Sequence, residues 1–246
     1  MRGGKSARAR LSRAMVLISL ALAACQAPAE PRAKSTSRTV AFPKADRPVA
    51  KIVSSRWSTE EARDRLREAD NVMNRAGITP GMTVADIGAG EGYYTIRLAA
   101  RVGKAGRVLA QDIVPEVRDA LAQRVNRERL DNVSVKLGEP ADPKLPENSF
   151  DRILMVHMYH EIAEPYAFLW HLRPALREGG QVIVVDADRP TVAHGTPPKL
   201  LACEFRAVGF EQVRFETMPQ AGGYFAAFEA RGARPEPGAI KACASQ

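Results

Sequence analysis

Residues 84–94 read Val84-Ala85-Asp86-Ile87-Gly88-Ala89-Gly90-Glu91-Gly92-Tyr93-Tyr94. An apolar run leads into three glycines at alternate positions, and an apolar helical pattern follows over 93–102. Glycines permit a tight turn and a close approach of a ligand to the backbone. The free N–H groups at the start of a helix attract a carboxylate. The stretch therefore predicts a strand, loop and helix that bind a small ligand.

An acidic residue, Asp112, follows the second expected strand, on the same side of the expected sheet as the glycine loop. Asp112 comes 20 residues after Gly92, at the end of the second expected strand, 107–111. A carboxylate in that place can hold both hydroxyls of a ribose. A dinucleotide oxidoreductase is the nearest rival, but its fingerprint is G-x-G-x-x-G, whereas Gly88, Gly90 and Gly92 are spaced G-x-G-x-G. A turn without a ligand is the other alternative.

Strand and helix patterns alternate along most of the chain. The expected strands are 83–87, 107–111, 133–137, 153–156, 181–185, 213–217 and 224–229, and the expected helices are 93–102, 114–127, 165–177 and 200–207. An earlier helix begins at the capping box Ser58-Thr59-Glu60-Glu61, and its apolar face consists of Ala62, Leu66, Ala69, Val72 and Met73. Repeated βα units predict an α/β, doubly wound, mostly parallel seven-stranded sheet with helices on both faces and an antiparallel closing hairpin.

The glycine-rich stretch resembles motif I of the class I, Rossmann-like S-adenosylmethionine (SAM) methyltransferases. Their usual form is an acid, one residue and Gly-x-Gly-x-Gly, and the likeness continues through Leu145-Pro146, Ser149-Phe150-Asp151 and Glu178-Gly179-Gly180. The resemblance implies that the glycine loop takes the methionine part of SAM and that Asp86 orients its ammonium group. Gly138-Glu139 match the adenine-binding segment, although Pro140 lacks the N–H that the family often presents there. The cofactor-binding residues implied are Asp86, Gly88, Ala89, Gly90, Gly92, Tyr94, Asp112, Ile113 and Glu139.

The fourth strand runs into His157-Met158-Tyr159-His160-Glu161, where the family binds the methyl acceptor. We expect His157 or His160 to act as a base and Tyr159 to position the acceptor. The alternatives are that one histidine caps the next helix while the other packs, and that methyl transfer relies on alignment alone. No metal site is predicted, because no third imidazole or thiolate stands at ligand spacing.

The N-terminus has the pattern of an export signal. Five basic residues precede the apolar run 14–24, which is too short to span a bilayer comfortably. Leu22-Ala23-Ala24-Cys25 resembles a bacterial lipobox, so we expect lipidation at Cys25, and Gln26 suggests the outer rather than the inner membrane. An ordinary signal peptide and an uncleaved anchor are the alternatives. The expected organisation is a signal peptide (1–24), a flexible linker (25–55), the methyltransferase domain (56–231) and a disordered tail (232–246).

The charge of the chain is concentrated near its start. The whole chain has a formal net charge of +8, but residues 58–246 hold 24 basic and 26 acidic side chains. A nearly neutral domain does not support a nucleic-acid surface, which needs a basic patch on the folded part. Cys203 and Cys243 could pair in an oxidising compartment, although we expect Cys203 to pack as a small apolar side chain.

These patterns leave two hypotheses about function. In the first, a membrane-tethered enzyme of the cell envelope transfers methyl from SAM to an unidentified small molecule or envelope component. In the second, a non-catalytic lipoprotein keeps the fold and binds SAM or a related nucleoside. The binding-protein hypothesis stays open because SAM is made in the cytoplasm, whereas a lipobox directs the protein out of the cytoplasm, away from the cofactor.

Overall fold

The computed structural model of the chain describes residues 41–52, 59–219 and 222–244. The expected signal segment, Cys25 and Ser58 lie outside these ranges. No helix within them is long and apolar enough to cross a bilayer.

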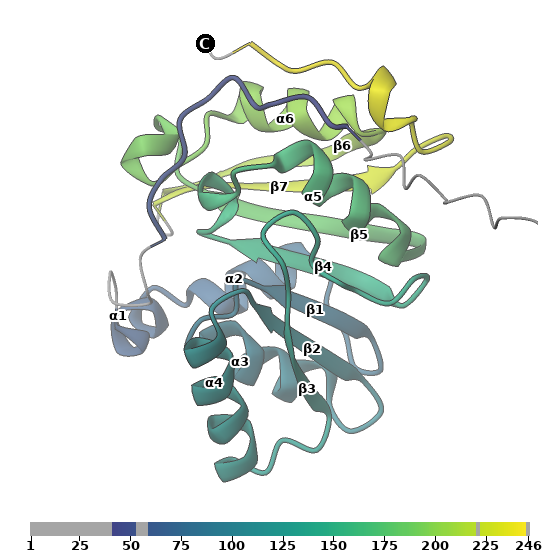
Figure 1. The fold of residues 1–246 in the computed structure, drawn as a ribbon. Coiled ribbons are helices and arrows are strands. Elements are labelled where there is room, and N and C mark those ends of the chain that lie inside the picture. The colour runs from purple at the N-terminus through teal and green to yellow at the C-terminus, as the bar shows by residue number, and fades with distance from the viewer. Residues whose placement is uncertain (1–40, 53–58, 220–221, 245–246) are drawn as a thin grey trace, which may run out of the picture. The chain divides into compact units, whose positions relative to one another are not determined.

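The core is a seven-stranded sheet with helices packed on it (Figure 1). Its strands are β1 (Thr83–Ile87), β2 (Arg107–Asp112), β3 (Val133–Leu137), β4 (Phe150–Val156), β5 (Leu176–Asp186), β6 (Phe210–Met218) and β7 (Gly223–Ala230). The α-helices are α1 (Glu60–Arg65), α2 (Glu68–Arg75), α3 (Tyr93–Val102), α4 (Pro115–Arg127), α5 (Pro165–Leu172) and α6 (Pro198–Ala207). The 3₁₀ helices are η1 (Tyr159–Glu161), η2 (Arg173–Ala175), η3 (Thr191–Ala193) and η5 (Pro237–Ala239).

The strand order is β3-β2-β1-β4-β5-β7-β6. The first five strands in this order are parallel, and β7 is antiparallel to both β5 and β6. The predicted fold class is therefore confirmed. The chain leaves β1 in one direction towards β3 and then returns to place β4 on the other side of β1. A ligand crevice is expected at this reversal of strand order, beyond the carboxyl ends of β1 and β4.

Alternate residues of the strands build a core on each face of the sheet. Val84, Leu154 and Ile183 pack with α2 and α3 on one face. Ala85 and Ile153 pack with α5 and α6 on the other face. Because neighbouring strand residues point in opposite directions, near-continuous apolar strands are what a sheet covered on both faces requires.

The first predicted helix is broken in two. Arg67 has a left-handed φ of 52° and separates α1 from α2. As a result Leu66, expected on the apolar face, is 49% exposed, whereas the carboxylate residue Glu68 is buried. The prediction of one continuous helix is wrong here, because α1 turns towards the ligand crevice instead of following α2 along the sheet.

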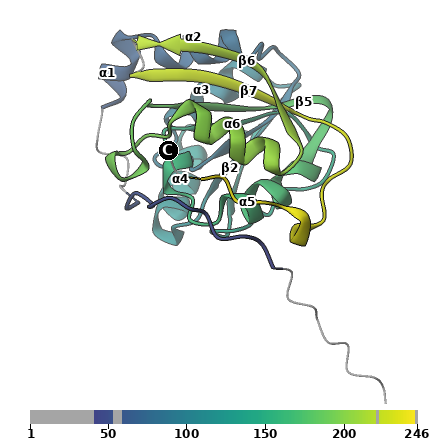
Figure 2. The same ribbon diagram turned by 90° about the horizontal axis from the view of Figure 1, so that it is seen from above.

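Residues 41–52, the part of the expected linker that the structure describes, pack against the domain. The prediction of a flexible linker is wrong for these residues. The Arg47 guanidinium forms a buried ion pair of 2.8 Å with Glu204 on α6. The Pro48 carbonyl accepts a hydrogen bond from Thr191, and the Ala50 N–H donates to the His160 carbonyl. These contacts fix this segment on the side of the sheet that carries α5 and α6 (Figure 2).

The tail from Gly232 is packed as well, contrary to the expected disorder. Cys243 forms a disulfide with Cys203 on α6, with a Cα–Cα distance of 6.1 Å. Its N–H donates to the Tyr166 hydroxyl, and Ile240 is buried in the core beside α5. The expectation that Cys203 packs only as a small apolar side chain is therefore corrected, since the tail brings a second thiol to it.

Candidate active site

A cavity of about 1270 Å³ opens beyond the carboxyl ends of β1, β2 and β4. Residues 87–91 and 111–114 line the part that follows β1 and β2, called here the cofactor side. Residues 156–158, 160–163 and His194 line the part that follows β4, called here the acceptor side. Ligand pockets usually measure about 300–1000 Å³. The cavity is therefore large enough for a cofactor and a second molecule together.

The glycine loop is shaped as the sequence predicts. Gly88 and Gly90 have left-handed φ values of 66° and 56°, and both line the cavity. Gly92 is the N-cap of α3 with a φ of 92°, and a Cβ there would lie 2.4 Å from a Leu121 methyl carbon. Since L side chains rarely adopt this conformation, the loop brings bare backbone to the cofactor side.

Asp112 lies at the end of β2 and lines the cavity. One carboxylate oxygen accepts a hydrogen bond of 3.0 Å from the Gly90 N–H, and the other accepts one of 3.0 Å from the Val114 N–H. Each oxygen has lone pairs for a further donor. The backbone therefore orients this carboxylate, as ribose binding requires. Ile113 also lines the cavity beside it.

Asp86 lies deeper than the motif suggests. It is 3% exposed, and its carboxylate accepts a hydrogen bond of 2.6 Å from Thr95 on α3. Burial raises the pKa of Asp86 to about 6, although the Thr95 hydrogen bond acts in the opposite direction. Within the described chain Asp86 is not among the cavity-lining residues, so its implied contact with the SAM ammonium stays a prediction.

The adenine-binding segment differs from the expectation. The Glu139 side chain is 64% exposed and pairs with Lys144 at 3.4 Å, and only its neighbour Pro140 lines the cavity. Gln111 lines the cavity, and its buried side-chain amide nitrogen has no hydrogen-bond partner within the described ranges. Sequence reasoning missed Gln111, although it directly precedes Asp112 on a strand that ends at the cavity.

Helix α1 covers part of the cavity and introduces a buried charged network that the sequence did not reveal. Arg63 lines the cavity and donates to Glu68 at 2.6 Å. Its guanidinium carbon also lies 3.8 Å from the ring centroid of Tyr93. The Tyr94 hydroxyl donates to the same Glu68 carboxylate, so Tyr94 supports the site from beneath and does not line the cavity.

His157 joins the same network. It lines the cavity, has a left-handed φ of 56°, and places Nε2 at 3.5 Å from a Glu68 oxygen. Burial would raise the pKa of Glu68, but hydrogen bonds from His157 and Arg63 outweigh it and lower that pKa to about 2. The imidazole is thus held against an ionised carboxylate at the edge of the acceptor side.

Tyr159 does not lie where it was predicted to act. It is fully buried, its hydroxyl donates to Glu204 at 2.8 Å, and its ring packs on Phe205. The prediction that Tyr159 positions the acceptor is therefore wrong. The turn of η1 directs this side chain away from the cavity and under α6, where Arg47 pairs with the same Glu204.

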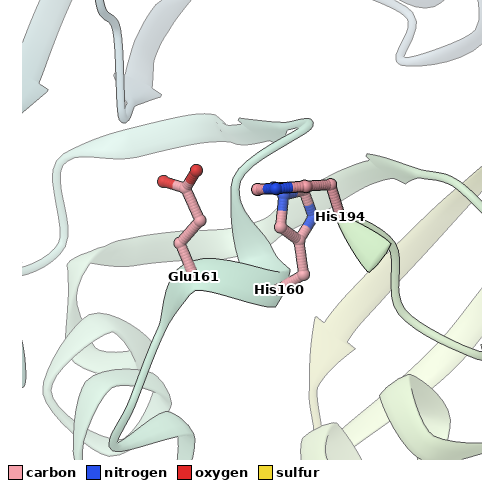
Figure 3. A group of neighbouring side chains, drawn as sticks. All are labelled: His160, Glu161 and His194. Atoms are coloured by element: carbon pink, nitrogen blue, oxygen red, sulfur yellow. The ribbon is translucent and has the colours of Figure 1, made fainter. Parts of the chain in front are cut away.

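His160 and Glu161 line the acceptor side, and His194 lies beside them (Figure 3). The His160 Nδ1 lies 3.0 Å from the carboxylate of Asp186, the last residue of β5. His194 follows η3, and its ring centroid is 5.4 Å from that of His160. Neither Asp186 nor His194 was a predicted site residue, since they lie 26 and 34 positions beyond His160 in the sequence.

Comparison with known proteins agrees with this geometry. Residues 84–180 match the family model of a methyltransferase domain. A demethylmenaquinone methyltransferase from Geobacillus sp. (strain WCH70) is 25% identical over 130 residues, covering 53% of this chain and 56% of the relative. Nocamycin O-methyltransferase from Saccharothrix syringae is 32% identical over 176 residues, covering 55% and 61%. The crystal structure of a SAM-dependent methyltransferase from Aquifex aeolicus matches with a TM-score of 0.61 at 26% identity, covering 68% of this chain and 90% of that one.

The seven-stranded sheet has the Rossmann-like fold of SAM-dependent methyltransferases, and the glycine loop with Asp112 lies within the part of the chain that matches a methyltransferase domain. These likenesses imply a methyltransferase activity with SAM as the cofactor. The chain spans about half to three-fifths of the length of the curated relatives it matches. The export signal and the lipid anchor stay predictions.

Proposed function

We propose that the protein transfers a methyl group from SAM to an acceptor bound on the acceptor side of the cavity. The observation that carries this proposal is one continuous cavity with the glycine loop and Asp112 on one side and His157 and His160 on the other. A protein that only bound SAM would need no second compartment lined with imidazoles. The non-catalytic binding lipoprotein remains the alternative to be tested.

The transfer is an in-line displacement at the methyl carbon. A bond forms between that carbon and the acceptor atom, the bond to the sulfonium breaks, and its electron pair stays on sulfur to give S-adenosylhomocysteine. A hydroxyl or thiol acceptor must lose its proton before or during the transfer, whereas an amine can lose it afterwards. We assign activation of the acceptor to His160, which lines the cavity. Its Nδ1 is bound to Asp186, so its Nε2 is the nitrogen that is left to take a proton from the acceptor. His157, held by Glu68, supports the wall of the same side.

The acceptor is proposed to be a small molecule or an envelope component, and the protein to be tethered to the membrane. The relatives named above act on different acceptors by their names, so they select none for this chain. The Cys203–Cys243 disulfide supports an oxidising compartment such as the envelope. The nearly neutral domain offers no support for nucleic acid as the acceptor.

The test is methyl transfer from labelled SAM by the full chain to phenols, thiols, amines, carboxylates and envelope extracts. SAM affinity is measured by isothermal titration in parallel. We expect transfer to at least one acceptor, and a turnover at least about 100-fold lower in His160→Gln with SAM affinity unchanged. Tight SAM binding with no transfer to any acceptor would support the binding lipoprotein.

A further inference from the structure

We propose that His160, Glu161 and His194 bind a divalent transition metal ion, best matched by Zn²⁺, on the acceptor side of the cavity. The potential ligand atoms of the three residues all lie within 4.8 Å of one another. Ligand atoms around a tetrahedral zinc ion are separated by about 3.3 Å, given Zn–N and Zn–O bonds of about 2.0–2.2 Å. Small side-chain rotations would therefore close the set around an ion.

The hydrogen bonds of His160 prepare it to be a ligand. An ionised carboxylate can only accept a hydrogen bond, so the contact of 3.0 Å with Asp186 places the imidazole proton on Nδ1. Nε2 then keeps its lone pair, which a metal ion requires. Metal-binding histidines almost always donate their other N–H to a carboxylate or a carbonyl in this way.

Asp186 is itself firmly held. It is fully buried, and its carboxylate accepts hydrogen bonds from the Thr196 hydroxyl at 2.7 Å and the Ala187 N–H at 2.9 Å. Thr196 belongs to the same loop as His194, and its carbonyl accepts a hydrogen bond from the buried Tyr224 hydroxyl. The network around Asp186 therefore fixes the His160 imidazole and anchors the loop that carries His194.

His194 supplies a third ligand. The sequence predicted no metal site, because no third imidazole stands at ligand spacing from His160. The His194 Nδ1 is buried and has no hydrogen-bond partner within the described ranges. A buried polar nitrogen without a partner is costly unless a ligand occupies it. The residue also adopts a left-handed φ of 57°, which turns its ring back towards η1.

The ligand types determine which ion fits. Two imidazoles and one carboxylate form a set that binds zinc in catalytic sites and leaves a position open for water or substrate. Mg²⁺ prefers oxygen ligands and an octahedral shell, so it fits poorly. With neutral imidazoles the ion and its three ligands would carry one positive charge, which the Asp186 carboxylate beside His160 would balance.

The location in the cavity indicates what the ion would do, and this step rests on the proposed function. A bound metal ion lowers the pKa of an oxygen or sulfur atom that coordinates it. An acceptor hydroxyl or thiol would release its proton to water, and the resulting anion would attack the methyl carbon. The acceptor class inferred is therefore a small molecule with an ionisable hydroxyl or thiol. His160 would then act as a ligand of the ion instead of removing the proton itself.

The first experiment measures metal binding alone, without SAM or acceptor. The full chain is stripped with a chelator and titrated with Zn²⁺, Co²⁺ and Mg²⁺ by calorimetry, and the visible absorption of Co²⁺ reports its coordination. We expect tight binding of Zn²⁺ and Co²⁺ but not Mg²⁺, a loss of at least 100-fold in Zn²⁺ affinity in His160→Gln with His194→Gln, and a loss of about 10–100-fold in Asp186→Asn. Glu161→Gln, which keeps the side-chain shape, should also weaken binding.

The matched control is His171→Gln, because that imidazole bonds to the Ala141 carbonyl outside the cavity and should leave Zn²⁺ affinity unchanged. Retained SAM binding shows that each variant is folded. Equal Zn²⁺ affinity in the native chain and the double variant would overturn the metal site. Methyl transfer that survives complete chelation would overturn the inferred activation of the acceptor by the ion while leaving the proposed function intact, with His160 then acting directly as a base.

Discussion

The Asp112 carboxylate both binds the backbone around it and faces the cavity. It accepts hydrogen bonds from the backbone of the glycine loop and from the start of the segment leading to α4, and it faces the cavity with its remaining lone pairs. A carboxylate that is already oriented loses little freedom when a ribose binds, so its contribution to cofactor affinity should be large for a single residue.

We predict that Asp112→Ala weakens SAM binding tenfold or more. Charge-assisted hydrogen bonds are worth about 1.5–3 kcal/mol each, and about 1.4 kcal/mol corresponds to a factor of ten. Isothermal titration with SAM measures the change, and Asp119→Ala, an exposed carboxylate on α4, is the control that should leave affinity unchanged. A folded Asp112→Ala variant with native SAM affinity would remove this residue from the cofactor site.

The predicted cofactor-binding residues that line the cavity lie in continuous stretches of sequence. Gly88, Gly90 and Asp112 could be placed because a strand end determines where the next few residues lie. Tyr159 was misplaced because a 3₁₀ turn rotates each residue by about a third of a circle, and so separates it from His160 beside it. Asp186 and His194 could not be found, since only the order of β4 and β5 in the sheet brings them to His160.

At the scale of helices and strands, the periodic patterns predicted most of the sheet and three of the helices closely. Strands β1 and β3 and helix α3 have the predicted bounds. The break between α1 and α2 was missed, because helical periodicity does not reveal a single left-handed residue such as Arg67. The cause is tertiary: Glu68 is buried against Arg63, Tyr94 and His157, and a straight helix would not hold Arg63 at the cavity.

This junction predicts a pH-dependent contribution to stability. The pKa of Glu68 is about 2 in the folded protein, below its ordinary 4.5, so its contribution is complete above pH 4.5 and is lost as the pH falls towards 2. Glu68→Gln should lower the free energy of unfolding by about 3 kcal/mol at pH 7. Denaturant unfolding at pH 7 and pH 3 should show the gap between the variant and the native chain narrowing by roughly half.

The control for this experiment is Glu61→Gln, an exposed carboxylate on α1, whose effect on stability should be small at both pH values. A Glu68→Gln gap that stays constant from pH 7 to pH 3 would show that the carboxylate does not titrate with the lowered pKa. In that case the buried ion pair with Arg63 would not be what fixes α1 over the cavity.

At the scale of the whole molecule, composition misjudged both ends of the domain. Segments rich in proline and small residues were expected to be flexible, yet 41–52 and the tail both pack beside α5 and α6. Each is held by specific long-range contacts, among them the ion pair of Arg47 with Glu204 and the disulfide of Cys243 with Cys203. Composition reports the average tendency of a segment and contains no information about such a single distant contact.

The disulfide should contribute measurably to stability. Cys203 and Cys243 are 40 positions apart, and closing a loop of this size stabilises a protein by about 2–4 kcal/mol, mainly by restricting the unfolded chain. The double variant Cys203→Ser, Cys243→Ser should therefore lose roughly 5–15 °C in Tm. Thermal unfolding of the native chain with reductant should reproduce this loss, and equal Tm values with and without reductant would contradict it.

The same disulfide bears on where the protein works, which Cys25→Ser tests directly. If Cys25 carries the lipid anchor, this variant should leave the membrane fraction and keep its unprocessed mass, because the modified cysteine becomes the mature N-terminus. A single acyl chain binds a membrane only marginally, so stable retention in the native protein requires more than one.

Fractionation of cells, with fatty-acid labelling of the native chain, measures both effects, and Cys203→Ser is the control that should stay membrane-bound. Unchanged mass and unchanged retention in Cys25→Ser would exclude a lipoprotein, and a fully reduced Cys203–Cys243 pair in freshly isolated protein would argue against export altogether.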